Sequence, residues 1–67
     1  MKILNQRIRL KRLEKNMKQI DLAKKLGVSQ SSIANWESGE REPALAIIID
    51  LSKVFGCSVN YLLGLED

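Results

Sequence analysis

The 67-residue sequence contains no histidine and a single cysteine, Cys57. One cysteine cannot form an internal disulfide, and without histidine a Cys/His zinc site is excluded. The longest apolar run, Ala44 to Ile49, falls far short of the roughly 20 residues of a membrane span. The N-terminus has no separate apolar signal region either. We therefore expect a protein of the reducing cytoplasm, with no membrane association and no metal or other cofactor.

The chemistry of an enzyme is also missing. The sequence has no histidine base, no nucleophile with a plausible neighbour, and no glycine loop that cradles a phosphate. Its carboxylates are scattered singly among cations, so we expect no catalysis and no small-molecule ligand. At this length we expect one domain, residues 1–67, which buries only about 60% of its unfolded surface.

Positive charge is concentrated in the first part of the chain. Residues 1–25 hold nine Lys and Arg against two acids, a net charge of +7, whereas residues 26–67 carry a net charge of −4. Such a run is typical of a solvated helix face, and a basic amphipathic helix can also lie on an acidic membrane. It also suits a polyanion such as nucleic acid.

Residues 19–37 read as two short helices that meet at a tight corner. Gly27 can take the left-handed conformation that ends a helix, and Ser29 can cap the next helix by accepting a backbone N–H. The apolar spacing gives each helix one inner face, and these two faces must meet. The inner residues are Leu22, Ala23 and Leu26, continued by Val28, on the first helix, and Ile33 and Trp36 on the second.

The outer face of the second helix is uncharged and made of small residues. Gln or Asn can bond an adenine edge bidentately in the major groove, and Ser can bond several bases. This face therefore favours a helix-turn-helix that reads DNA, and favours nucleic acid over lipid, although an ordinary solvated helix shows similar residues. The candidate base-reading residues are Gln30, Ser31 and Asn35, with Ala34 between them and Ser29 and Ser32 at the flank.

The sequence resembles the phage-repressor and Cro-like family of helix-turn-helix proteins. The matching residues are Gln19, Leu22-Ala23, Leu26-Gly27-Val28-Ser29, Ile33, Trp36-Glu37, Gly39, Pro43-Ala-Leu45, Leu51, Phe55-Gly56 and Tyr61-Leu62-Leu63. The resemblance implies an all-α fold, a compact five-helix bundle of the lambda-repressor-like DNA-binding type. It implies a sequence-specific regulator of transcription that binds double-stranded DNA, of the phage or bacterial repressor type. A protein-interaction module, or an antitoxin that combines both roles, remains open.

The resemblance also implies residue roles. Arg12 is expected to pair with Glu37 and so to fix the angle between the first and third helices. Two departures stand out, because Lys18 replaces the usual Ser or Thr cap, and Glu40 and Glu42 flank Arg41 where relatives carry cations. The candidate phosphate-binding residues are Lys18, Gln19, Ser29, Ser32, Ser38, Gly39 and Arg41.

Three more helices are expected around the corner. The first spans residues 4–16, with Asn5 as a possible cap and Ile8, Leu10, Leu13 and Met17 facing inward. The fourth begins at Pro43 and runs to Phe55, with Leu45, Ile48, Leu51, Ser52 and Phe55 inward. Ser58 caps the fifth, residues 59–63, which Gly64 ends.

A single reading helix covers few base pairs, so we expect a homodimer on a palindromic site. The fifth helix offers more apolar area than its docking needs, and Tyr61 is the expected anchor. The expected interface consists of Val59, Tyr61, Leu62, Leu63 and Leu65, and the alternative is that these residues only seal the core of a monomer.

Overall fold

The computed structural model describes residues 2–67, which form five α-helices and the loops that join them. The helices are α1 (Lys2–Glu14), α2 (Gln19–Leu26), α3 (Gln30–Ser38), α4 (Leu45–Phe55) and α5 (Val59–Leu63), and this part of the chain has no strand. The helices form a bundle of about 27 × 23 × 20 Å. This confirms the expected all-α, five-helix fold. None of these helices is long and apolar enough to cross a membrane.

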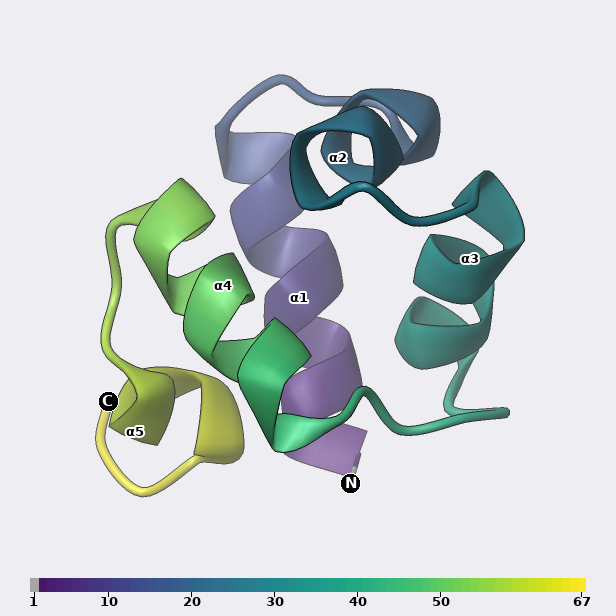
Figure 1. The fold of residues 1–67 in the computed structure, drawn as a ribbon. Coiled ribbons are helices and arrows are strands. Elements are labelled where there is room, and N and C mark those ends of the chain that lie inside the picture. Colours follow the sequence, from purple (N-terminus) through teal and green to yellow (C-terminus); the bar gives the residue numbers. More distant parts are fainter. Residues whose placement is uncertain (1) are drawn as a thin grey trace.

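Helix α1 packs against α3, α4 and α5, while α2 closes the bundle over α3 and α4 (Figure 1). All five helices contribute to one apolar core. This packing stabilises them, because helices this short are at best marginally stable in water on their own. The buried apolar residues are Leu4, Ile8, Leu22, Ala23, Ile33, Trp36, Ile48, Leu51, Phe55 and Leu62.

The helix ends follow their local chemistry. Gly27 ends α2 in the left-handed conformation, with φ of 70°, and the Ser29 hydroxyl accepts the Ser32 N–H at 3.2 Å. Ser58 caps α5 in the same way by accepting the Tyr61 N–H at 2.9 Å. The predicted corner between α2 and α3 and the predicted start of α5 are both confirmed.

The buried face of α1 differs from the prediction. Leu4, Ile8 and Arg12 are buried, whereas Leu10 and Leu13 are each about half exposed. Asn5 is a buried residue within α1, which begins at Lys2, so Asn5 does not cap this helix. The spacing of apolar residues in α1 defines two faces, and the sequence alone gave no means of choosing between them.

The fourth helix is also displaced from its predicted start. It begins at Leu45 after Ala44 in an extended conformation, and Pro43 is buried ahead of it. Ile48, Leu51, Ser52 and Phe55 face inward as predicted, but Leu45 is 63% exposed. Helical spacing does not show how far along its axis a helix is covered, and the first two residues of α4, Leu45 and Ala46, lie outside the covered part.

Candidate nucleic-acid interface

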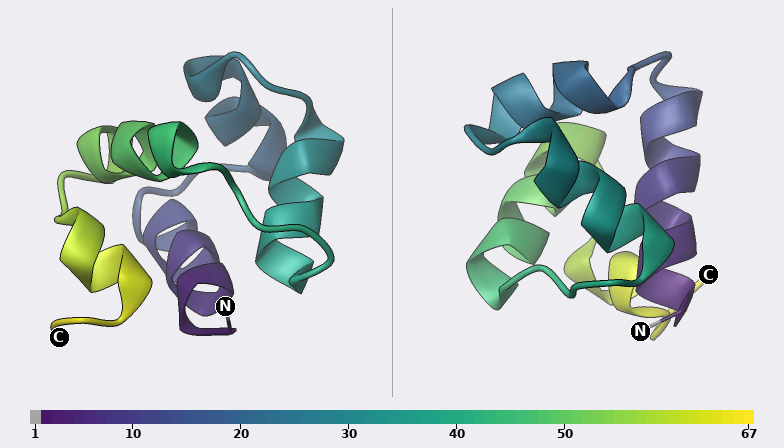
Figure 2. Two further views of the ribbon diagram at one scale, coloured as in Figure 1. Left: turned by 60° about the horizontal axis from the view of Figure 1, so that its bottom comes forward. Right: turned by 90° about the vertical axis from the view of Figure 1, so that its right-hand side faces the viewer.

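Helix α3 lies on the surface of the molecule, against α1 and α2 (Figure 2). Ile33 and Trp36 anchor its inner face in the core. On its outer side Gln30 and Ser31 are exposed, and Asn35 is half-buried. All three predicted base-reading residues therefore stand on one helix, although Asn35 is less accessible than the other two.

Three hydroxyls gather at the N-terminus of α3. The Ser29 Oγ lies 3.1 Å from the Ser31 Oγ and 3.0 Å from the Ser32 Oγ. A hydroxyl can both donate and accept, so these groups keep capacity for a base edge or a phosphate. The helix dipole adds partial positive charge at this end, which favours an anion.

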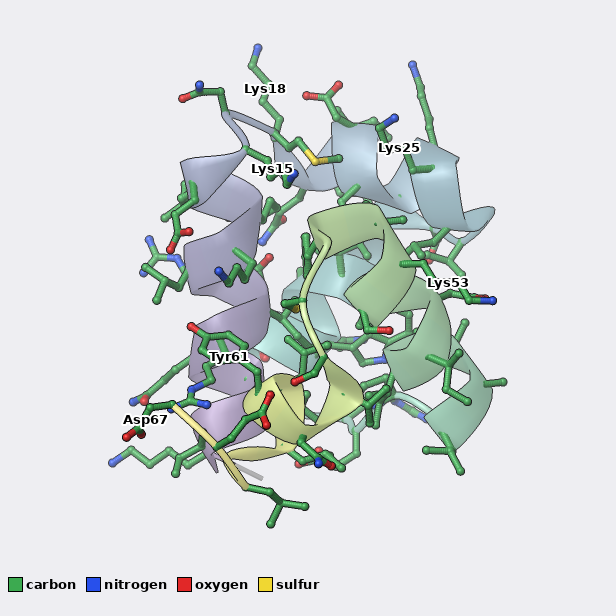
Figure 3. All side chains as sticks on the ribbon, turned by 90° about the vertical axis from the view of Figure 1, so that its left-hand side faces the viewer. Lys15, Lys18, Lys25, Lys53, Tyr61 and Asp67 are labelled. Atoms are coloured by element: carbon green, nitrogen blue, oxygen red, sulfur yellow. The ribbon has the colours of Figure 1, made fainter. Side chains whose placement is uncertain are left out.

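The N-terminus of α2 has a carboxylate cap from within the helix. The Lys18 N–H donates to Asp21 Oδ2 at 2.9 Å. The Lys18 ammonium cannot return a capping bond, because it has no acceptor. Its side chain is exposed, at the end of the molecule where Lys15 and Lys25 also lie (Figure 3). The predicted loss of a Ser or Thr cap is thus offset in part by Asp21.

Arg12 of α1 and Glu37 of α3 form a bidentate ion pair. Arg12 Nε donates to Glu37 Oε2 at 2.6 Å and a terminal guanidinium nitrogen donates to Oε1 at 3.0 Å. The two side chains are only 9% and 5% exposed, and another Arg12 nitrogen donates to the Met17 carbonyl at 2.8 Å. The hydrogen bond to Glu37 raises the pKa of Arg12 above its ordinary value, more than burial lowers it.

Gln19 joins this pair to α2. Its side-chain nitrogen donates to Glu37 Oε1 at 3.3 Å, so one carboxylate holds α1, α2 and α3 together. A carboxamide nitrogen carries two protons, and the second stays available for a phosphate at the start of α2. Gln19 is therefore positioned by the ion pair, a connection that its place in the sequence did not indicate.

The loop after α3 uses its own backbone amides. The N–H groups of Gly39 and Arg41 both donate to the Asn35 carbonyl, at 3.1 and 3.2 Å, and the Glu40 N–H donates to the Ser38 hydroxyl at 3.3 Å. The Gly39 N–H is thus engaged within the loop, and its predicted phosphate contact stays a prediction. Gly39 also shapes the turn, with φ of 86°. The exposed Arg41 side chain remains the cation of this loop.

Asn5 of α1 contacts the same loop at Gly39 and was not among the predicted site residues. A Cβ atom on Gly39 would lie 2.7 Å from the Asn5 side-chain nitrogen, so the two residues are in close contact. Asn5 lies on the same face of α1 as Ile8 and Arg12. Its polar side chain would have indicated a structural role if that face had been known to be buried.

The predicted dimer surface on α5 is smaller than expected. Leu62 is fully buried in the core, so it cannot contact a second chain. The Arg7 guanidinium lies 4.2 Å from the Tyr61 ring centroid, and the Lys11 ammonium 4.8 Å, so cations of α1 cover this ring. Leu65 is 72% exposed, and Val59 and Leu63 are half-buried.

Arg7 also holds the residues that follow α5. Its guanidinium donates to the carbonyls of Tyr61 and Glu66. The Ser58 hydroxyl also bonds the Glu66 carboxylate, so the residues that follow α5 return to the bundle.

The chain belongs to the helix-turn-helix family, whose model, described as "Helix-turn-helix", matches residues 8–62. It is 39% identical over 61 residues to repressor protein C2 of Salmonella phage P22, across 91% of this chain and 28% of that protein. It is 40% identical over 65 residues to the transcriptional regulator DicA of Escherichia coli, across 96% of this chain and 48% of DicA. The chain thus spans half or less of the length of these two relatives.

Two solved structures of the P22 repressor share this fold. The crystal structure of that repressor in complex with a synthetic operator has a TM-score of 0.83 at 39% identity, covering 88% of this chain and 89% of the other. The solution structure of its DNA-binding domain has a TM-score of 0.84 at 40% identity, covering 90% of this chain and 79% of the other.

Proposed function

We propose that this chain is a transcriptional regulator that binds double-stranded DNA sequence-specifically in the cytoplasm, a repressor of the phage or bacterial type. The observation that carries the proposal is the uncharged outer side of α3, bearing Gln30 and Ser31, at a helix-turn-helix corner within a chain whose first 25 residues carry a net charge of +7. Its membership in the helix-turn-helix family, and its likeness to a repressor solved with an operator, support the same function.

In this proposal α3 enters the major groove. Gln30 and Asn35 bond adenine edges through their carboxamides, and Ser31 bonds a neighbouring base. Phosphates are held by the start of α2, the start of α3 and the loop after α3, which fix the register of the reading helix. The phosphate-binding residues are Lys18, Gln19, Ser29, Ser32, Ser38 and Arg41.

The Arg12–Glu37 pair sets the geometry for this reading. It fixes α3 to α1 through two hydrogen bonds and draws Gln19 of α2 to the same carboxylate. The distance between the phosphate-binding start of α2 and the reading helix α3 is therefore already fixed in the DNA-free protein. Such preorganisation reduces the entropy that binding must offset.

We further propose that two copies bind a palindromic operator with their α3 helices one turn of duplex apart, about 34 Å. Leu65 supplies the exposed apolar contact, flanked by Val59, Leu63 and the edge of Tyr61. This interface is small, so we expect the dimer to assemble on DNA rather than in free solution.

The base-reading assignment is tested by selecting bound sequences from a random duplex pool and measuring affinities for the enriched site and for random DNA. Gln30→Ala should cost about 1–3 kcal/mol on the selected site and leave random binding unchanged. Lys18→Ala is the matched control, because loss of a phosphate contact should weaken both and reduce the salt slope by about 1. Equal weakening of both DNAs by Gln30→Ala would refute base reading by Gln30, and a pool without enrichment would refute sequence-specific binding.

The dimer is tested by stoichiometry on the selected duplex. Two chains should bind per duplex at saturation, and Leu65→Lys should lower the cooperativity of binding. Leu45→Lys is the control, because Leu45 is similarly exposed but lies on α4, whereas Leu65 follows the end of α5. One chain per duplex at saturation rejects the dimer and leaves the proposed DNA binding in place.

A further inference from the structure

Helix α1 carries a second apolar face that the bundle leaves about half exposed, with Ile3 at one end of it beside Gly64. Ile3, Leu10 and Leu13 are 47%, 48% and 49% exposed. At about 100° per residue, their mean direction lies roughly 180° from that of the buried Leu4, Ile8 and Arg12. The outer side of α1 has no other helix against it in either Figure 2 or Figure 3. Scattered exposed leucines are ordinary, whereas an aligned set opposite the core is not.

This outer face borders a groove. Gln6, Arg9, Leu10, Leu13 and Glu37 line a space of about 400 Å³. The Glu37 carboxylate at its border is neutralised by Arg12 and is only 5% exposed. The two leucines therefore provide the groove with its accessible apolar surface, and Arg9 provides its accessible charge.

The charge on the α1 side of the groove is positive. Glu14 is the only acid of α1, and it is paired with Lys11 at 3.4 Å. Lys2 and Arg9 are both exposed, and the helical spacing places both on the Leu13 side of the stripe. A partner for this face needs apolar side chains for the leucines and carboxylates for these cations.

We propose that this groove on α1 is a docking site for an acidic amphipathic helix of another protein. Apolar side chains spaced three or four residues apart on that helix contact Leu10 and Leu13, and its flanking Asp or Glu residues face Arg9 and Lys2. A second copy of this chain fits worse, because it would bring one basic α1 against another. A DNA backbone offers nothing apolar to the leucines, and a flat lipid surface does not fill a groove.

The test is an NMR titration of the isotopically labelled 67-residue chain with a designed helical peptide. The peptide carries Leu at i, i+3 and i+7 with Glu on both flanks, and the matched control peptide has Lys in place of every Glu. We expect the Glu peptide to shift the amide signals of Gln6, Arg9, Leu10 and Leu13. The Lys peptide should bind at least about tenfold more weakly, because it repels the basic rim.

Leu13→Lys should weaken binding of the Glu peptide by about tenfold or more, since a buried leucine contact is worth a factor of this order. Leu45→Lys on α4 is the matched control and should bind like the parent chain. Arg9→Gln is a second, milder variant, and it should weaken binding while reducing its salt dependence. It keeps the test decisive if Leu13→Lys fails to fold.

Three results would overturn the proposal. The first is no shift at these four residues, and the second is equal binding of the Glu and Lys peptides. The third is Leu13-dependent binding to phosphatidylserine vesicles, or Leu13-dependent self-association in sedimentation, without binding of the peptide. These outcomes are independent of operator binding, which is measured separately on the selected duplex.

Discussion

Replacing Glu37 with Gln tests whether the Arg12–Glu37 pair holds the reading helix in place. The substitution keeps the size of the side chain and removes its charge. In the parent chain the carboxylate accepts two hydrogen bonds from Arg12 and one from Gln19. A neutral carboxamide has one acceptor oxygen in place of two, so Arg12 could no longer bond two separate oxygens and would lose its counter-charge.

The expected loss of stability is large for so small a protein. Breaking a buried pair by removing one partner costs about 3–5 kcal/mol, because the other charge stays buried without compensation. The low exposure of both side chains places this pair in that class. A domain of this size has a total stability of roughly 3–10 kcal/mol. At about 4–8 °C per kcal/mol, a loss of about 3 kcal/mol lowers the melting temperature by about 12–24 °C.

Thermal melts followed by circular dichroism at several protein concentrations measure this effect. Glu14→Gln is the matched control, because the Lys11–Glu14 pair lies on the surface and exposed pairs contribute about 0–1 kcal/mol. The double variant Arg12→Met with Glu37→Met should lose much less than the sum of the two single changes, since no charge is left buried. The reasoning fails if Glu37→Gln melts within about 2 °C of the parent, or no lower than Glu14→Gln.

Three smaller predictions concern a glycine turn, the thiol and the α2 cap. In urea titrations Gly39→Ala should lower the free energy of unfolding by about 1–3 kcal/mol more than Gly27→Ala does. Both alanines would have positive φ, but only the Cβ at position 39 would contact Asn5. Equal losses for the two variants would contradict this contact. Burial raises the pKa of the Cys57 thiol, so iodoacetamide should alkylate it more slowly in the folded chain than in urea at the same pH. The free energy of unfolding should also fall as pH rises from the ordinary thiol range through the raised folded value, because the folded state retains the proton longer, and a flat profile would argue against it. Lys18→Ser should raise stability by about 1 kcal/mol through a new cap at the start of α2, with Lys18→Ala as the control that adds none.

The sequence by itself determined the ends of α2 and α4, the starts of α3 and α5, and the inner face of the reading helix. Gly27 with Ser29, and Gly56 with Ser58, are chemical signals that act within three or four residues, so they work without knowledge of the fold. Ile33 and Trp36 are the only large apolar residues of α3, so its buried face had no competitor. The family resemblance added the pairing of Arg12 with Glu37, which no local pattern shows.

The tertiary structure decided which of two possible faces is buried and which polar groups are already used. Helix α1 has apolar residues on opposite sides, and contact with α3, α4 and α5 selects Leu4 and Ile8 over Leu10 and Leu13. The burial of Leu62 and the exposure of Leu45 depend on how far neighbouring helices extend, which is a property of the packed bundle. The Gly39 N–H donates to the Asn35 carbonyl, and the Gln19 carboxamide donates to the Glu37 carboxylate. Hydrogen bonds of this kind form between groups brought together by packing, and helical periodicity carries no information about them.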